Sequence, residues 1–266
     1  MNLSLFAILG ACAIGLSLGL LGSGGSILTV PVLVYLVDQP EKIAIAGSLV
    51  IVGSIALLGA LPYFKQRFID WNVVLIFGVP GMLGTYLGAW LATVYLSGIQ
   101  QLAIFALVML LASYFMLKPK KIIETSSDHQ RHLFKISMDG LIVGIVTGIV
   151  GVGGGFLIVP ALVLLGGLSM RRAIAASLVI IALKSFTGFV KYWSAIADDP
   201  SMQLDWSVIG AMIILGGIGS TIGNKIANKV PQDNLKKVFG VFLIVMGIYI
   251  LVRSTPQIIW PFVFTS

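Results

Sequence analysis

The sequence predicts an all-α polytopic membrane protein made of two inverted-topology repeats, each a glycine-broken helical hairpin followed by three transmembrane helices. Three observations predict this class: an apolar composition, an internal repeat and an uneven distribution of basic residues. Of the 266 residues, 58% are hydrophobic and 10% are charged, whereas a soluble domain carries about 25% charged residues. The composition excludes most soluble enzymes and nucleic-acid-binding proteins, and the formal net charge of +7 is therefore interpreted as a topology signal.

An internal repeat divides the chain into two halves. At an offset of 129 residues, positions 15–51 align with 144–180 without a gap, and 18 of the 37 pairs are identical. Glycine and proline positions match as well as apolar ones, which chance apolar similarity would not produce. After an insertion near Ala197 to Pro200 the offset becomes 135, so that Asp70-Trp71 corresponds to Asp205-Trp206. The expected organisation is a first membrane repeat (1–117), a cytoplasmic linker (118–135) and a second membrane repeat (136–266).

The first element of each half is a long apolar region that glycines and then a proline interrupt. These regions are 3–37 and 137–167. Glycine destabilises a helix by about 1 kcal/mol per residue, so the consecutive glycines within Gly22 to Ser26 and Gly151 to Gly155 predict breaks. A helix over 26–37 would reach only about 18 Å, too short to cross a bilayer. The N-terminal stretch has no Lys or Arg before its apolar run, and because its glycine pattern returns in the second half, it is interpreted as part of the fold rather than a signal peptide.

Three ordinary spans follow in each half. Each has about 20 apolar residues, the length that crosses a hydrocarbon core about 30 Å thick. The expected spans are 43–63, 72–94 and 99–117 in the first half, and 173–193, 206–228 and 236–253 in the second. Glycines at four-residue spacing are expected to be helix contacts: Gly15 and Gly19, Gly144 and Gly148, Gly84 and Gly88, Gly219 and Gly223.

The basic residues distinguish two topologies. If each broken region crosses the membrane once, Lys and Arg divide nine against seven between the faces. If it folds back as a hairpin, thirteen lie on one face: Lys65, Arg67, Lys118, Lys120, Lys121, Arg131, Lys135, Arg171, Arg172, Lys225, Lys229, Lys236 and Lys237. Only Lys42, Lys191 and Arg253 then lie on the other. Because basic residues accumulate on the cytoplasmic side, this favours inverted repeats, with the linker in the cytoplasm and both termini outside.

The glycine breaks predict an anion-binding site. A helix that starts after a break has N–H groups without intrahelical partners, and its positive dipole end attracts anions. In inverted-repeat transporters such half-helix ends meet near the bilayer midplane. The backbone candidates for substrate binding are Gly22, Gly24, Gly25, Ser26, Gly151, Gly153, Gly154 and Gly155, and Pro31 and Pro160 are candidate structural or hinge positions.

Three side chains complete the candidate substrate site. Lys184 lies in the middle of a span, where an ionisable group costs at least about 2.5 kcal/mol. We expect a counter-charge for the substrate; the alternatives are a lysine paired with a backbone carbonyl or one directed toward an interface. Its counterpart in the first half is Ile55. Ser48 and Ser177 correspond in the repeat, and each could donate to an anion or to its own helix backbone.

Several other functional classes lack a signal. None of the Asp and Glu residues lies deep in a span, so a carboxylate proton relay is not expected. The single cysteine, Cys12, permits no internal disulfide, and His129 and His132 fall in the polar linker, so no metal site, cofactor or enzyme activity is expected. Trp71, Trp206, Trp260 and Tyr63 lie near span ends and are expected to be interface anchors.

Both halves carry the motif G-x-x-G-x-G-G-x-x-x-x-x-P followed by Ala-x-Ala-x-Ser-Leu, and this pattern resembles the sulfite exporter TauE/SafE family. The residues that carry the resemblance are Gly19, Gly22, Gly24, Gly25, Pro31 and Ser48, and Gly148, Gly151, Gly153, Gly154, Pro160 and Ser177. The resemblance implies a multi-span permease of the inner (plasma) membrane that moves small sulfur-containing anions, such as sulfite or organosulfonates, usually outward.

The function expected from these observations is secondary transport of a small anion by alternating access. A channel for anions or small solutes remains the alternative, because the same glycine-rich constriction could serve it. The expected partners are a small anionic substrate, the lipid bilayer and a coupling proton, and no nucleic acid. The sequence leaves the oligomeric state open, with a homodimer as one option.

Overall fold

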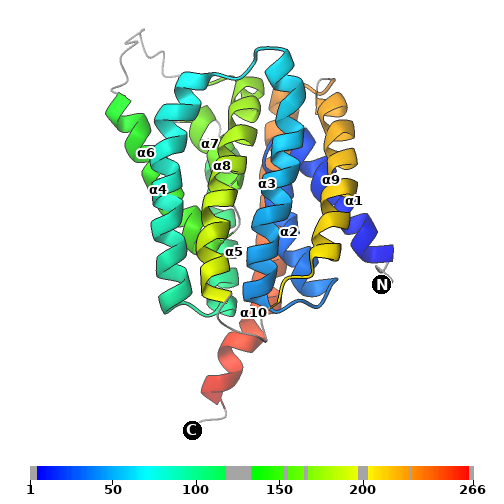
Figure 1. Ribbon diagram of the computed structural model, residues 1–266, viewed down its shortest axis with the longest axis vertical. Helices are drawn as coiled ribbons and strands as arrows, with labels where there is room; N and C mark the ends of the chain where they lie inside the picture. Colours follow the sequence, from blue (N-terminus) through cyan, green and yellow to red (C-terminus); the bar gives the residue numbers. More distant parts are fainter. Residues whose placement is uncertain are drawn as a thin grey trace.

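The computed structural model describes residues 5–117, 133–151, 155–164, 167–196, 203–227 and 229–263. Within these ranges every regular element is a helix, and the helices form one bundle (Figure 1). The first half contains α1 (Leu5–Leu21), α2 (Gly24–Tyr35), α3 (Glu41–Lys65), α4 (Trp71–Tyr95) and α5 (Gly98–Leu117). The second half contains α6 (Leu133–Val150), α7 (Gly155–Leu164), α8 (Met170–Ile196), α9 (Trp206–Ala227) and α10 (Gln232–Val263). Residues 118–132, most of the predicted linker, lie outside the described residues.

The membrane-spanning character of the chain is confirmed by the long helices. Among the described residues, α3, α4, α8 and α9 are long and apolar enough to cross a membrane. Helices α5 and α10, with 20 and 32 residues, occupy the other two predicted spans. The outer faces of α4 and α9 expose large apolar side chains such as Leu83 and Ile214, which are 63% and 66% exposed. Such exposure is expected where the surrounding solvent is lipid.

Aspartate caps fix where the corresponding helices α4 and α9 begin. Asp70 Oδ1 accepts hydrogen bonds from the N–H groups of Asn72 and Val73, at 3.1 and 3.3 Å. Asp205 Oδ1 accepts from the residues two and three positions on, at 3.0 and 3.1 Å. An N-cap aspartate satisfies N–H groups that have no intrahelical partner, so the repeat in sequence becomes a repeat in local structure.

Each long apolar region is broken at its glycine cluster, as predicted. Helix α1 ends at Leu21, and Gly22 turns the chain with a φ of 71°; helix α6 ends at Val150, and Gly151 has a φ of 72°. Left-handed backbone of this kind favours glycine. The predicted second interruption by proline is wrong, because α2 and α7 continue through Pro31 and Pro160. Both prolines are buried, and packing around them offsets the cost of a proline inside a helix.

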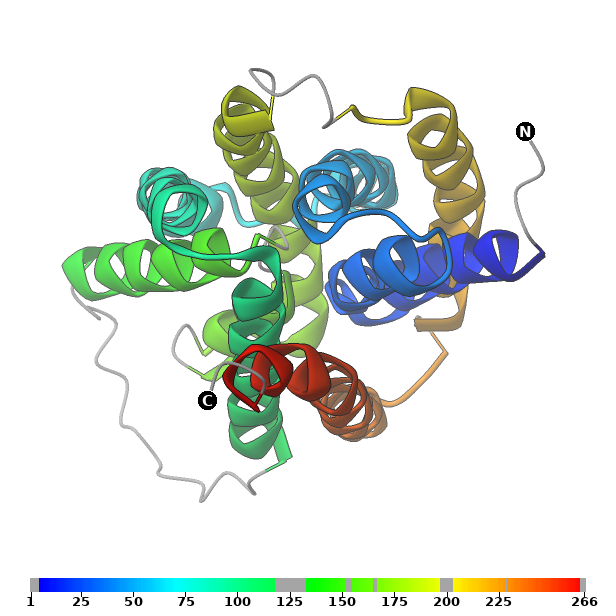
Figure 2. The ribbon, with the colours of Figure 1, turned by 90° about the horizontal axis from the view of Figure 1, so that it is seen from below.

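Helices of one half pack mainly against helices of the other half. Helix α1 packs on α9 and α6 packs on α4, while α3 packs on α8 and α5 on α10. Figure 2 shows these pairs from below. In the repeat, α1 corresponds to α6 and α9 corresponds to α4. The contact between α1 and α9 is therefore equivalent to the contact between α6 and α4. In Figure 1, α3 runs upward and α8 downward, and α4 and α9 likewise run in opposite directions.

Glycines allow the closest of these helix pairs. A Cβ atom on Gly15 would overlap the carbonyl oxygen of Gly216, and one on Gly144 would overlap that of Gly81; these contacts correspond in the repeat. Small residues let membrane helices approach to backbone contact. The predicted packing role is therefore confirmed for all four pairs: Gly15 and Gly19, Gly144 and Gly148, Gly84 and Gly88, Gly219 and Gly223.

The aromatic residues near the span ends divide into two groups. Trp71 and Trp206 are 49% and 54% exposed, in keeping with interface anchors. Tyr63 is only 4% exposed, and its hydroxyl donates to Asn224 Oδ1 at 3.4 Å. The interface role expected for Tyr63 is wrong, because the α3 face that carries it packs against α9, where a buried hydroxyl needs a partner.

Candidate functional site

The turns of the two broken hairpins lie against helices of the opposite half. A Cβ on Gly22 would lie 2.8 Å from Ile174 Cγ2 in α8. A Cβ on Gly151 would overlap Ile45 in α3 and lie 2.8 Å from the Tyr192 hydroxyl. Ile45 and Ile174 are corresponding residues of the repeat, so each hairpin turn rests on the start of the other half's central helix.

The two short helices begin next to each other. A Cβ on Gly155, the first residue of α7, would lie 3.1 Å from Ser26 Oγ near the start of α2 and 2.7 Å from Ile181 Cδ1. Ser26, Gly155 and the middle of α8 are thus brought together. The Ser26 hydroxyl donates to the carbonyl of Ser23 at 2.7 Å, within its own helix start. Gly153 and Gly154 lie outside the described residues.

Gly24 and Gly25 fold α2 tightly back on α1. A Cβ on Gly25 would lie 2.5 Å from the carbonyl oxygen of Ile14, and one on Gly24 would lie 3.1 Å from that of Ser17. Both glycines are buried. Their absence of side chains keeps the first turn of α2, with its positive dipole end, deep in the bundle.

Ser23 is a further candidate residue that the sequence did not reveal. It occupies the N-cap position of α2, yet its side chain makes no capping hydrogen bond. The side chain is fully buried, and its Oγ has no hydrogen-bond partner among the described residues. Serine at this position normally caps the helix. Its counterpart in the second half is Val152, so the comparison of the two halves did not single it out.

Lys184 is fully buried in α8. A Cβ on Gly81 of α4 would lie 3.4 Å from its Cδ and 3.6 Å from its Cε, so the aliphatic stem packs on that glycine. Its Nζ has no hydrogen-bond partner in the described part of the chain, and the alternative of a pairing with a backbone carbonyl is not observed there. Lys184 follows Ile181 by three residues, so both lie on one face of α8. Ile181 contacts the first residue of α7, and Lys184, one turn further along α8, packs on α4.

Lys184 and Ser185 are adjacent polar residues of α8, and neither has a polar equivalent in the first half. Ser185 Oγ is also buried and without a partner among the described residues. The corresponding residues are Ile55 and Ala56, both buried and apolar. Ile55 contacts Gly216 just as Lys184 contacts Gly81. The contact between this position and a glycine is thus present in both halves, but only the second half has an ionisable side chain there.

The two matched serines share a contact with the carbonyl three residues earlier, and Ser177 has a second acceptor in the other half. Ser48 donates to the carbonyl of Ile45 in its own helix at 2.7 Å, which is the structural alternative noted for this residue. Ser177 Oγ lies 2.9 Å from the Ile174 carbonyl and 3.2 Å from the Gly22 carbonyl. Ser177 therefore ties the first hairpin turn to α8.

Metal ligands do not gather in the described ranges, where no group of three or more His, Cys, Asp or Glu residues could hold an ion. His129 and His132 lie outside these ranges. The chemistry available around the starts of α2 and α7 is a lysine side chain, serine hydroxyls and helix N-termini, which together can hold an anion.

Comparison with known proteins identifies similar membrane transporters. The family model described as "Sulfite exporter TauE/SafE" matches residues 7–250. A "Probable membrane transporter protein" of Xylella fastidiosa (strain 9a5c) is 31% identical over 252 residues, covering 92% of this chain and 94% of the relative. A similarly named protein of Methanocaldococcus jannaschii is 26% identical over 250 residues, covering 90% and 93%. The "Probable membrane transporter protein YunE" of Bacillus subtilis is 27% identical over 270 residues, covering 93% and 96%. No solved structure matches the chain significantly.

Proposed function

The chain belongs to the sulfite exporter TauE/SafE family of membrane transporters, and we propose that it is a secondary transporter for a small sulfur oxyanion or organosulfonate. The family name supports the substrate class, and the buried positive charge supports an anion. The proposed substrate-binding residues are Ser23, Ser26, Gly155 and Lys184, with the backbone of the two glycine clusters.

The observation that carries this proposal is a lysine and serines buried without partners in a bundle where the starts of α2 and α7 meet. Ser23 Oγ, Lys184 Nζ and Ser185 Oγ have no hydrogen-bond partner among the described residues. A buried unsatisfied polar group costs about 1 to 3 kcal/mol, and more if charged. A protein that keeps such donors buried without partners is expected to satisfy them with a ligand. An oxyanion accepts from all three donor types.

The proposed transport cycle uses the two-fold relation between the halves. The repeat, the equivalent contacts of α1 with α9 and α6 with α4, and the opposite directions of α3 and α8 support inverted-topology repeats. In such transporters one repeat moves relative to the other around a fixed central site. The hairpin turns at Gly22 and Gly151 each rest on the other half, so movement between halves would alternately loosen these contacts.

Lys184 gives the proposed site its charge complementarity. A buried ammonium attracts an anion strongly because the surrounding dielectric is low. A hydrogen bond to a charged group contributes about 1.5 to 3 kcal/mol, so Lys184 and the serine hydroxyls together can offset the dehydration of a small oxyanion. No carboxylate lies within the proposed site, and bisulfite can supply its own proton, which is consistent with proton-coupled export.

The proposed orientation places the basic end of the bundle in the cytoplasm of a plasma membrane. Lys65 and Arg67 follow α3, and Arg171 and Arg172 begin α8; both helix ends lie at the upper end in Figure 1. A reporter that is active only in the cytoplasm, fused after Ser266, should stay inactive. An active reporter contradicts this orientation and leaves the anion site itself untouched.

Transport measurements in proteoliposomes test the function. We expect saturable uptake of labelled sulfite or a sulfonate, accelerated by the same anion on the opposite side of the membrane. Sulfate and thiosulfate, added in competition, define the selectivity. A channel gives flux without trans-acceleration, and the names of the relatives, all membrane transporters, do not favour it. Absence of flux for every anion contradicts the proposal.

A further inference from the structure

A separate pocket lies at the basic end of the bundle, away from the proposed transport site. Its volume is about 500 Å³, and it is formed by the loop between α3 and α4, the start of α4, and one residue of α8. Its polar lining comprises Gln66, Arg67, Asp70, Asn72 and Arg172. The segments that form it, 66–72 and Arg172, are at least 100 residues apart in the chain, so only the fold creates this pocket.

The pocket carries an excess of positive charge. Arg67 and Arg172 contribute two guanidinium groups against the single carboxylate of Asp70. The Oδ1 atom of that carboxylate already accepts hydrogen bonds from two backbone N–H groups of α4. Within the described ranges, Arg67 and Arg172 form no ion pair. Guanidinium groups match the geometry of phosphate oxygens, and the side-chain amides of Gln66 and Asn72 add further donors.

Arg67 adopts a backbone conformation that ordinarily belongs to glycine. Its φ is 54°, in the left-handed region that longer side chains rarely occupy. The turn is held by a hydrogen bond from its N–H to the Phe64 carbonyl at 3.1 Å. Glycine here would relieve the strain, so the arginine is retained at a cost to folding. Strain of this kind is common at functional positions, and here it places a guanidinium in the pocket wall.

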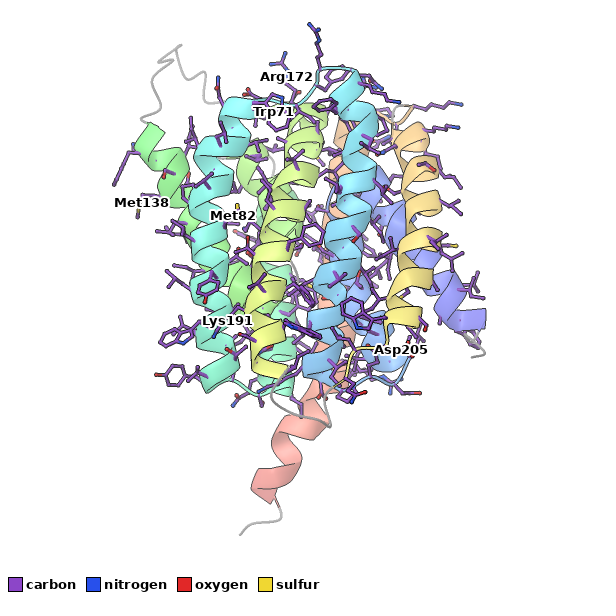
Figure 3. The ribbon with its side chains drawn as sticks, in the orientation of Figure 1. Trp71, Met82, Met138, Arg172, Lys191 and Asp205 are labelled. Carbon is purple, nitrogen blue, oxygen red and sulfur yellow. The ribbon has the colours of Figure 1, made fainter. Side chains whose placement is uncertain are left out.

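The pocket is bordered by aromatic side chains of the kind found at the depth of the lipid headgroups. Trp71, which lines it, is 49% exposed and packs edge-on against the 59% exposed Phe64, with ring centroids 6.2 Å apart. Exposed tryptophan at the end of a span marks the membrane interface. Figure 3 shows Trp71 and Arg172 together at the upper end of the bundle, with Lys191 near the opposite end.

The opposite end of the bundle repeats the helix cap without the arginines. Asp205 caps α9 as Asp70 caps α4, and Trp206 corresponds to Trp71. The residues that correspond to Arg171 and Arg172 are Lys42 and Ile43, and Ile43 is buried. Arg171 and Arg172 are therefore not part of the pattern that the two halves share.

We propose that this pocket binds the headgroup phosphate of an anionic phospholipid in the leaflet at the basic end of the bundle. Arg67 and Arg172 hold the phosphate oxygens, while the exposed rings of Trp71 and Phe64 border the glycerol and upper acyl region. Basic pockets at the cytoplasmic ends of membrane helices are suited to such headgroups. The lipid would connect the α3–α4 loop to the start of α8.

Lipid-dependent thermal unfolding tests the proposal on the purified full chain in neutral detergent. We expect phosphatidylglycerol to raise Tm by several degrees and phosphatidylcholine to raise it much less. The double variant Arg67→Gly with Arg172→Gln should lose at least half of the phosphatidylglycerol shift. Without lipid its Tm should equal or exceed that of the wild type, because the strain at position 67 is gone. The control Lys42→Gln with Lys191→Gln removes two charges at the opposite end and should keep the full shift.

Three outcomes overturn the proposal: equal shifts with both lipids, a full shift in the arginine double variant, or an equal loss in the lysine control. Inorganic phosphate without lipid is a separate arm. If it gives the same arginine-dependent shift, the pocket is a site for soluble oxyanions and the lipid assignment is wrong. None of these measurements involves transport, so the result does not depend on the proposed function.

Discussion

The hydroxyl of Ser177 in α8 lies 3.2 Å from the carbonyl oxygen of Gly22, the first residue of the turn between α1 and α2. This hydrogen bond joins the second half of the chain to the broken hairpin of the first. Gly22 also packs against Ile174 one turn earlier in α8. The position of the hairpin turn is therefore set by the opposite repeat, and a change in α8 should be felt at the start of α2.

Ser177→Ala should lower both stability and transport. The substitution leaves the Gly22 carbonyl without this donor, and a hydrogen bond of this kind contributes about 0.5 to 1.5 kcal/mol. Thermal unfolding in detergent and uptake of labelled sulfite measure the two effects. The matched control is Ser48→Ala, whose hydroxyl bonds only within its own helix; its effect on stability should be smaller, because no contact between the halves is lost. Equal losses in the two variants would show that the link between the halves is unimportant.

Lys184→Met should abolish most anion transport without destabilising the protein. The substitution removes the charge that is proposed to hold the anion, so uptake should fall at least about tenfold, the equivalent of 1.4 kcal/mol. Stability should hold or rise, because a buried ammonium without a partner is unfavourable. Ile55→Met alters the corresponding contact with Gly216 and should leave transport nearly unchanged. A strong loss of stability in Lys184→Met would instead indicate a structural lysine.

Ser23→Ala should raise KM for the anion and leave thermal unfolding unchanged. The hydroxyl has no partner among the described residues, so its removal costs no hydrogen bond in the free protein. In the proposed complex it donates to an anion, and losing that interaction should raise KM about tenfold or more. Ser17→Ala is the control in the neighbouring helix, since its hydroxyl donates to the Ile14 carbonyl. An unchanged KM in Ser23→Ala removes Ser23 from the site.

Gly15→Ala should disrupt the contact between α1 and α9. Its Cβ would overlap the main-chain carbonyl of Gly216, and overpacking costs about 1 to 3 kcal/mol, with the upper end expected where the obstacle is backbone. Gly144→Ala, which meets Gly81 in the corresponding contact, should behave the same way. Gly210→Ala is the control in α9, because a Cβ there meets nothing within 4 Å; it should stabilise by up to about 1 kcal/mol through helix propensity. Similar thermal stabilities of Gly15→Ala and Gly210→Ala would contradict the close packing.

Local features were predictable because short-range physics decides them. The caps at Asp70 and Asp205, the breaks after Leu21 and Val150, and the long apolar helices follow from residue types within a few positions of each element. Glycine spacing also predicted which faces approach closely. The proline interruptions failed for the opposite reason: packing from other parts of the chain carries α2 and α7 through Pro31 and Pro160.

The candidate site was predictable in part. The sequence singled out Lys184 by its charge within an apolar span and Ser26 and Gly155 by the glycine clusters, and the structure brings Ser26 and Gly155 into contact. It did not reveal Ser23, because a serine before a helix is usually a cap, nor that Tyr63 points inward to Asn224. Which hydroxyls lack a partner depends on neighbours more than one hundred residues away.

The sequence by itself determined the solvent, the number of repeats and the places where helices break, because composition, self-similarity and glycine runs are properties of the chain alone. The tertiary structure decided how the halves dock: each hairpin turn lies on the other half's central helix, the starts of α2 and α7 meet, and a lysine and several serines are buried without partners among the described residues. Those outcomes rest on side-chain packing between distant segments, where a single methyl group at Gly15 or Gly22 would collide with the opposite half.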